Sequence, residues 1–428
     1  MRRVTFFFPL IALCLMNFHA GAQERRYCGT MEYLERQKAE DPTIEKRMQE
    51  AEEMMQEIER QTAGMRNSEI VITIPVVFHV LYYNVSQNIS DNRIFDQLNT
   101  LNKDYAHLNL DTANTPAVFK PLAANTNIQF CLAHTDTNGN YTTGIIRKQV
   151  AVTGFDPLSN DNVKYSALGG DDIWDRSKYL NIWVCNFTGT SAQVGLLGIA
   201  QFPNMAPATD GVVFKYSTVG GNTYQGTENS YKFGRTATHE VGHWLYLYHI
   251  WGDDGNACTG TDYVTDTPNQ ADENYTCTSF PHISCSNGPN GDLYMNYMDY
   301  GVDACKNMFT TGQKNRMNAT LNSSRAAIKT STMCNDATGI SNPSGQIMFN
   351  IYPNPSTAEF VISSQLNESS DASVKVSNMI GETVFTKEFK NVPYLVQKID
   401  LSNRVNGMYF IEIKTPKGVS TGRLILSR

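Results

Sequence analysis

The chain has 428 residues, of which 41% are hydrophobic, 11% aromatic and 18% charged, and its formal net charge is -7. A chain this rich in apolar and aromatic residues forms folded domains rather than general disorder, and its length suggests about two or three of them. The acidic balance offers no basic surface for a phosphate backbone, which argues against nucleic-acid binding.

The N-terminal residues have the features of a cleaved signal peptide. Arg2 and Arg3 form a positive start, residues 4–16 are apolar, and residues 20–22 are a small-residue cleavage site. The rest of the chain has no long apolar run, so no membrane-spanning segment is expected once the signal is removed. Residues 1–22 are therefore predicted to be the signal peptide of an exported protein.

Residues 23–66 have the composition of a helical leader. They are rich in Glu, Lys, Arg, Met and Gln, and Pro42 suits the first turn of a helix that runs to about Gln61. Apolar positions in this helix are few, so we expect a detachable pro-segment rather than part of a core. Arg60 and Arg66 are candidate processing sites.

Residues 67–335 are predicted to form a mixed α/β (α+β) domain. A long β-branched run at residues 70–83 indicates a buried strand, and Ser90 precedes an amphipathic helix. Further short strands are expected at residues 128–133, 179–185, 196–202 and 211–216. A strand, a helix and then several strands before the next helix favour a mixed sheet covered by helices.

Residues 234–251 read GRTATHEVGHWLYLYHIW and contain a candidate zinc site. His239 and His243 are four residues apart, so a helix places both imidazoles on one face. His249 becomes a third ligand if the helix ends and the chain turns back. Three protein ligands and a water make a catalytic zinc site rather than a closed structural one. Glu240, next to the first ligand, has the position of a general base.

Eight cysteines remain after the signal peptide, and four of them lie in residues 258–305. This stretch is rich in Gly, Asn, Asp and Thr, so disulfides are the expected source of its stability in an exported protein. Spacing alone allows all three pairings of the four cysteines. The pairing of Cys131, Cys185 and Cys334 is equally open.

Cys28 lies in the leader, upstream of the candidate zinc ligands. Its thiolate is a good zinc ligand and would block the site until the leader is removed, as in proteases with a cysteine switch. A disulfide with Cys334 or another cysteine is the alternative.

The C-terminal region has a different character. Residues 336–349 form a polar linker, and residues 350–428 contain alternating strands separated by turns about every 8–12 positions, which predicts an all-β sandwich. The segments IYPNPS, NGMYFIEIKT and GRLILSR resemble the C-terminal sorting domain of the type IX secretion system. This resemblance implies contact with outer-membrane secretion machinery and a secreted or cell-surface protein of a Gram-negative bacterium. A carbohydrate- or protein-binding sandwich is the alternative.

The motif HEVGHWLYLYH, with MNYMDYGVDAC downstream, resembles the metzincin metalloproteases and specifically the pappalysin family. The resemblance spans residues 74–305 and implies a zinc endopeptidase acting on protein or peptide substrates. The implied zinc ligands are His239, His243 and His249. Glu240 would be the general base, Met298 the Met-turn residue beneath the zinc, and Tyr300 a donor to the developing oxyanion.

The same resemblance implies features of the loop that follows the motif. It pairs Cys258 with Cys285 and Cys277 with Cys305. Relatives carry calcium in the matching loop, and hard cations prefer oxygen ligands. The candidate calcium ligands in this chain are Asp262, Asp266 and Thr267.

Asp303 lies just after the Met-turn, on the segment that in the resembling family walls the pocket for the residue after the cut. A carboxylate there would favour Arg or Lys through a charge-assisted hydrogen bond. The alternative is a solvated aspartate in a loop.

The chain departs from the family pattern at Tyr246, where the pattern has Gly. Gly lets the chain leave the helix sharply, whereas a Tyr with positive φ costs about 1–2 kcal/mol. A catalytically impaired adhesion or binding protein is therefore the alternative function. The intact Glu240 argues against it, because nothing structural requires a carboxylate there.

Overall fold

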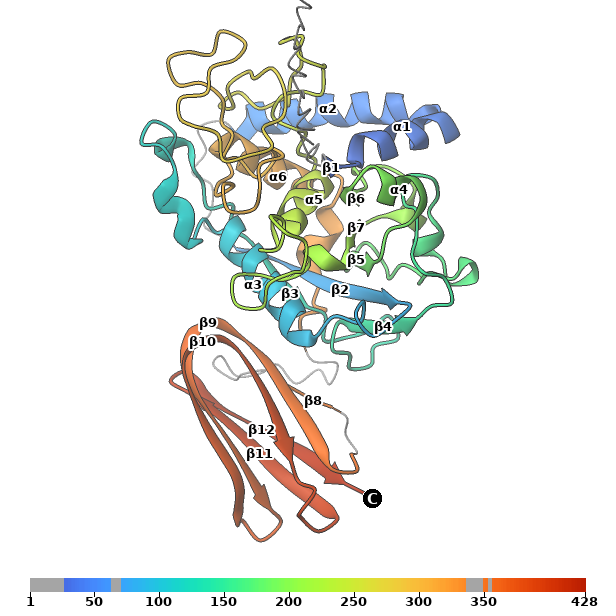
Figure 1. Cartoon of the computed structure of the whole chain (residues 1–428), viewed down its shortest axis with the longest axis vertical. Coiled ribbons are helices and arrows are strands. Elements are labelled where there is room, and N and C mark those ends of the chain that lie inside the picture. Colours follow the sequence, from blue (N-terminus) through green and yellow to red (C-terminus); the bar gives the residue numbers. More distant parts are fainter. Residues whose placement is uncertain (1–26, 63–70, 336–348, 353–355) are drawn as a thin grey trace, which may run out of the picture.

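The computed structural model describes residues 27–62, 71–335, 349–352 and 356–428. The predicted signal peptide, the candidate processing residue Arg66 and all but the last residue of the predicted linker lie outside this range. Figure 1 shows a body of helices around a sheet, followed by a body of strands. Within the described residues, no helix combines the length and the apolar character that crossing a bilayer requires.

A mixed sheet forms the centre of the first body. Its strands follow the order β1-β6-β7-β5-β2-β3, and β4 pairs with the second half of β2. They are β1 (Tyr27–Cys28), β2 (Ile72–Tyr82), β3 (Ile128–Leu132), β4 (Ile145–Gln149), β5 (Leu180–Cys185), β6 (Leu196–Ala200) and β7 (Val212–Lys215). Neighbours are parallel except for β6 and β7. This confirms the predicted mixed sheet.

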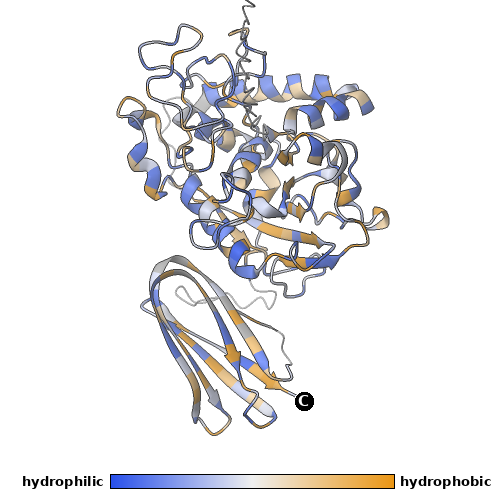
Figure 2. Cartoon of the chain, in the orientation of Figure 1, coloured by the Kyte–Doolittle hydropathy of each residue, from blue (hydrophilic) through white to orange (hydrophobic). Residues whose placement is uncertain are grey.

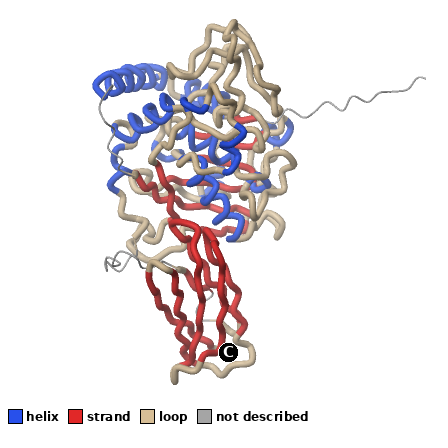
Figure 3. The backbone as a smooth tube through the Cα atoms, turned by 90° about the vertical axis from the view of Figure 1, so that its left-hand side faces the viewer, coloured by secondary structure: helices blue, strands red, loops and turns tan. Residues whose placement is uncertain are grey.

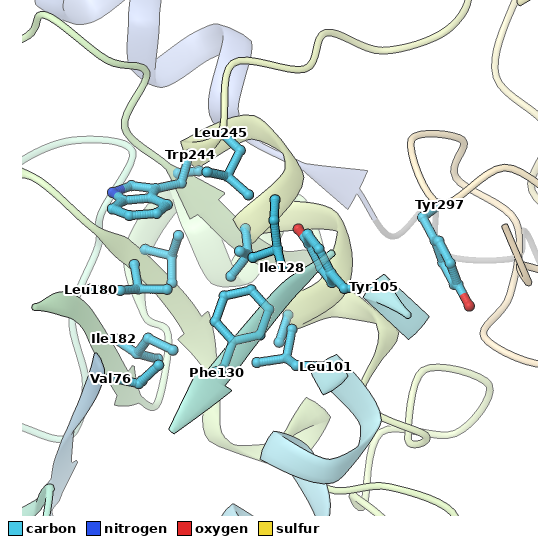
Figure 4. Close-up of a cluster of buried hydrophobic side chains, with 14 of the residues drawn as sticks. Val76, Leu101, Tyr105, Ile128, Phe130, Leu180, Ile182, Trp244, Leu245 and Tyr297 are labelled. Carbon is cyan, nitrogen blue, oxygen red and sulfur yellow. The ribbon is translucent and has the colours of Figure 1, made fainter. Parts of the chain in front are cut away.

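Helices cover the sheet, and the core lies between them and the strands. They are α1 (Thr30–Glu40), α2 (Thr43–Thr62), α3 (Asp91–Tyr105), α4 (Gly189–Gln193), α5 (Arg235–Trp244) and α6 (Thr311–Asn322). Figure 4 shows Trp244 and Leu245, at the end of α5, in one cluster with Ile128 and Phe130 of β3. Burial of a large apolar side chain contributes about 1.5–3 kcal/mol, so the core holds α5 firmly against the sheet.

Residues 245–310, between α5 and α6, contain no helix or strand and form the large loop region of Figure 3. Two disulfides, Cys258–Cys285 and Cys277–Cys305, cross-link it with the pairing that the family resemblance implies. Closing loops of 27 and 28 residues contributes about 3–4 kcal/mol each. Cross-links therefore replace regular secondary structure here.

The other cysteines of the described chain divide into one disulfide and two free thiols. Cys131 of β3 pairs with Cys334. Cys28 and Cys185 are free and buried. The alternative in which Cys28 forms a disulfide with Cys334 is therefore wrong.

The leader packs against the rest of the first body through α2. This helix spans nearly the residues predicted from the sequence, whereas α1 was not predicted. Ile44, Ala51 and Met55 lie on one face of α2 and are buried against Phe202 and Tyr246. Apart from the exposed Met54, the few apolar positions of this helix are thus used at one interface.

The C-terminal body is built from β8 (Asn350–Tyr352), β9 (Glu359–Asn378), β10 (Thr383–Asp400), β11 (Gly407–Thr415) and β12 (Gly418–Leu426). The sequence predicts short strands separated by turns, but the long strands β9 and β10 each run through positions that were predicted as turns. The start of β9 pairs with β8 and its end with β11, around a sandwich-like apolar core. Figure 2 shows hydrophilic and hydrophobic residues alternating along these strands.

Candidate metal centre

Helix α5 carries the first two histidines of the motif and places them on one face. The Nε2 atoms of His239 and His243 are 3.0 Å apart. Gly242, between them, lies against Met298, because a Cβ at Gly242 would come within 2.5 Å of the Met298 Sδ atom. Only Gly lets the helix approach Met298 this closely. The residue predicted for the Met-turn therefore packs directly on the motif helix.

The chain turns sharply after α5 and returns His249 to the other two histidines. Tyr246 has a φ of 73°, in the left-handed region, and the Leu247 amide donates a hydrogen bond to the Gly242 carbonyl at 3.0 Å. The Nε2 of His249 then lies 3.1 Å from the Nε2 of His243. A Tyr thus makes the turn for which the family pattern has Gly.

The side chain of Tyr246 makes contacts that offset the strain of its backbone. The guanidinium of Arg316 lies 4.8 Å from the centre of the Tyr246 ring, at a distance typical of a cation–π contact. The phenol donates a hydrogen bond to the carbonyl of Met48, in the leader helix α2, at 3.2 Å. Tyr246, which replaces the Gly of the family pattern, therefore contacts the leader.

Each histidine is oriented by a hydrogen bond from its other ring nitrogen. The Nδ1 atoms lie 2.7 Å from the carbonyl of Tyr297, the carbonyl of Leu247 and the carboxylate of Asp253, for His239, His243 and His249 respectively. A proton on Nδ1 leaves the lone pair of Nε2 free to bind a metal, and the Nε2 atoms of the three histidines lie together. Burial lowers the pKa of His239 and His243, which favours the neutral form that binds metal.

Cys28 of the leader joins the three histidines. The ligand atoms of the four residues all lie within 4.8 Å of one another, and all four residues are buried. Three imidazoles and one thiolate are donors that tetrahedral Zn²⁺ accepts, so this donor set fits zinc. Within the described chain, no other group of three or more His, Cys, Asp or Glu side chains meets the same condition.

Glu240 lies beside this donor set and contacts the leader. Its Oε2 accepts hydrogen bonds from the Cys28 thiol at 3.4 Å and from the Thr30 hydroxyl at 3.0 Å. Burial raises the pKa of Glu240 to about 7, against the lowering effect of these two bonds. Thr30 was not identified from the sequence, where its only signal is its place two residues after Cys28.

The leader reaches the donor set as a strand at the edge of the sheet. Tyr27 and Cys28 pair in parallel with Leu196 and Gly198 of β6. The hydroxyl of Tyr300 donates a hydrogen bond to the Cys28 carbonyl at 2.9 Å. The leader backbone therefore pairs with the β6 edge of the sheet, an edge that could otherwise pair with an extended peptide.

A cavity adjoins the donor set. It is lined by the leader residues Tyr27 and Cys28 and by Leu197, Tyr231, Thr236, His239, Glu240, Tyr300 and Lys306. Asp303 is fully buried and is not part of this lining. Its Oδ2 accepts a hydrogen bond from the Phe233 amide at 2.8 Å. Lys306 was not identified from the sequence, although it directly follows Cys305 after the Met-turn segment.

The candidate calcium ligands are only partly brought together. The carboxylate of Asp262 accepts hydrogen bonds from the Thr267 hydroxyl at 2.8 and 3.0 Å. Asp266 instead accepts hydrogen bonds from the Thr310 hydroxyl and the Gly312 amide, at the start of α6. Burial raises the pKa of Asp262 to about 7.

Comparisons with known proteins find extracellular metalloproteases and a secretion sorting domain. Residues 164–322 match the family model described as pregnancy-associated plasma protein-A, and residues 350–427 match the secretion system C-terminal sorting domain. An extracellular metalloprotease of Arthroderma benhamiae is 32% identical over 247 residues, or 58% of this chain and 76% of that protein. One from Neurospora crassa is 31% identical over 273 residues, or 61% of this chain and 79% of that protein.

Two solved structures from Tannerella forsythia are similar to this chain. A promirolysin variant is 44% identical with a TM-score of 0.64, and the match covers 71% of this chain and 97% of that one. Mature mirolysin in complex with a cleaved peptide is 48% identical with a TM-score of 0.58, covering 64% of this chain and 99% of that one. The match to the precursor form thus spans more of this chain.

Proposed function

Because the chain belongs to the pregnancy-associated plasma protein-A (pappalysin) family of metalloproteases, we propose that it is a secreted zinc endopeptidase made as a latent precursor. The observation that carries the proposal is the set of three histidine Nε2 atoms facing one point, with the buried carboxylate of Glu240 beside them. The sorting domain supports export through an outer-membrane secretion machinery to the medium or the cell surface.

The proposal divides the chain into five parts. Residues 1–22 are the signal peptide, 23–66 the pro-segment and 67–335 the catalytic domain. Residues 336–349 form the linker and 350–428 the sorting domain. The match of residues 350–427 to a sorting-domain model supports the last boundary.

The three histidines would hold Zn²⁺, which when bound polarises the scissile carbonyl group. In the processed protein, Oε2 of Glu240 is free of Cys28 and Thr30. It would accept a proton from the attacking water and pass it to the nitrogen of the leaving amine. The hydroxyl of Tyr300, which donates to the Cys28 carbonyl in the precursor, would donate to the substrate carbonyl oxygen as negative charge develops.

Latency would depend on two parts of the leader. The first is Cys28, whose thiolate completes the donor set. The second is Glu52 of α2, whose carboxylate forms two hydrogen bonds of 3.0 and 2.5 Å with the buried guanidinium of Arg316. Removal of one partner from such a buried pair typically costs about 3–5 kcal/mol, so this contact would hold α2 in place.

Chelation of the metal tests the proposal directly. The processed protein is incubated with a denatured protein, and the new ends are sequenced. Internal cuts are expected without a chelator and none with it, and added Zn²⁺ should restore cutting. Cutting that survives complete removal of zinc would contradict a metallopeptidase.

A thermal-unfolding experiment tests the proposed calcium ion at Asp262, Asp266 and Thr267. The buried carboxylate of Asp262 would gain a cation, so Ca²⁺ added to the zinc-loaded, calcium-free protein should raise the midpoint of thermal unfolding. Asp262→Asn should remove this rise. An equal rise in the variant would place the effect elsewhere.

Asp303 would give the peptidase a preference for Arg or Lys after the cut. The support is a fully buried carboxylate whose Oδ1 has no hydrogen-bond partner among the described residues. Asp303→Ala is expected to lower the rate for Arg relative to Leu at this position by roughly 10–100-fold. Cut sites in a peptide library give the ratio. An undiminished preference in the variant would make Asp303 a purely structural residue.

A further inference from the structure

A lysine lines the cavity that adjoins the donor set. Lys306 shares this lining with Leu197, Tyr231 and Thr236, next to His239. Its side chain is only 3% exposed. The charged groups that act on it are Asp303, Asp299 and Glu240, which attract its ammonium, and Arg235, which repels it. The cavity therefore contains a cation of its own.

Two buried oxygen atoms near this cation lack a hydrogen-bond partner within the described chain. They are Oγ1 of Thr236, which also lines the cavity, and Oδ1 of Asp303. The other carboxylate oxygen of Asp303 accepts from the amides of Phe233 and Arg235. A buried polar atom without a partner is unfavourable, so a polar substrate side chain is the occupant that this pocket suits.

We infer that Lys306 determines specificity for the substrate residue after the cut. It competes with a basic side chain at that position for Asp303, and it binds side chains that accept hydrogen bonds. The inference rests on the proposed peptidase function and deepens it. Burial raises the pKa of Asp303, and the charge of Lys306 opposes that rise more strongly than the charge of Arg235 does. The charge of Lys306 thus favours the ionised form of the buried Asp303 carboxyl.

The charge balance sets what the pocket accepts. A substrate Arg would have to share the Asp303 carboxylate with the Lys306 ammonium, whereas the nearby Arg235 is already paired with other carboxylates, those of Asp104 and Asp111. The side chain of a substrate Gln or Glu would instead accept a hydrogen bond from the Lys306 ammonium and another from the Thr236 hydroxyl. The protein should therefore cleave before Gln or Glu at rates within about tenfold of those before Arg.

Three fluorogenic peptides that differ only in the residue after the cut (Arg, Gln or Glu) test the inference on the zinc-loaded, processed protein. Lys306→Met is expected to raise the kcat/KM ratio of Arg to Gln by about tenfold or more, and that of Arg to Glu further. Ratios between peptides cancel any effect on Glu240, which acts on all three alike. Lys306→Arg keeps the charge and should keep the parent ratios.

Controls separate the outcomes. Lys329→Met removes an exposed lysine and should leave the ratios unchanged. If Lys306→Met does not fold, as judged by circular dichroism, Lys306→Gln replaces it. Ratios in the folded variant that stay within twofold of the parent would overturn the inference while the peptidase function stands. If the parent cleaves no peptide, the proposed function fails, and this inference fails with it.

Discussion

Glu240→Ala is expected to lower peptidase activity by at least about 10²–10⁴-fold while the fold and the zinc content stay unchanged. Glu240 has no place in the donor set of three histidines and Cys28. The hydrogen bonds described for its carboxylate come from two leader residues, Cys28 and Thr30. In the processed protein, its loss should therefore remove a proton acceptor and little else.

Zinc content by mass spectrometry, circular dichroism and the rate on a fluorogenic peptide measure the effect. Glu273→Ala is a suitable control, because this glutamate lies in the loop after α5 and does not line the cavity. It should retain activity. A Glu240→Ala protein that binds zinc and cleaves at the parent rate would rule out the proposed role of this carboxylate. Another group would then have to accept the proton of the water.

Cys28→Ala is expected to convert the latent precursor into one that cleaves peptides or itself during expression. The thiol lies within 4.8 Å of all three histidine nitrogens and is the leader's only member of the donor set. Its loss opens the position that a substrate carbonyl or a water would take. At least about a tenfold rise in precursor activity is expected, since a tightly held ligand excludes most of the substrate.

Precursor activity is measured on a short fluorogenic peptide, and N-terminal sequencing follows loss of the leader. Cys185→Ala is the matched control, because Cys185 is the other free, buried cysteine of the described chain. Its precursor should stay latent. If Cys28→Ala is as latent as the parent, the packing of α2 and the pair of Glu52 with Arg316 would suffice to close the cleft.

Much of the metal centre follows from the sequence because its first part is local. A spacing of four residues in a helix brings His239 and His243 together whatever surrounds the helix. The strands of the first body were predicted for a similar reason, since buried runs of β-branched residues indicate strands without knowledge of their partners. Strands β1 and β4 were not predicted, because β1 has only two residues and the sequence of β4, IIRKQ, has only two apolar residues.

The strand pattern of the C-terminal body was predicted less well. Polar residues in the middle of β9 and β10 were taken for loops, yet the two strands remain paired on both sides of that region. Alternation of polar and apolar residues reports which side chains are buried. It does not report whether a polar stretch keeps its backbone hydrogen bonds, because a partner strand can supply them.

The sequence by itself determined the zinc motif, its likeness to a protease family and the sorting domain, and it predicts the export signal, because each is a pattern of neighbouring residues. Only the tertiary structure decided what lies opposite that motif. Cys28 and Glu240 are 212 positions apart, and Cys131 and Cys334 are 203 apart. Such contacts depend on which strand forms the sheet edge and where a long loop returns, so no local spacing encodes the leader at the donor set or Lys306 in the cavity with His239.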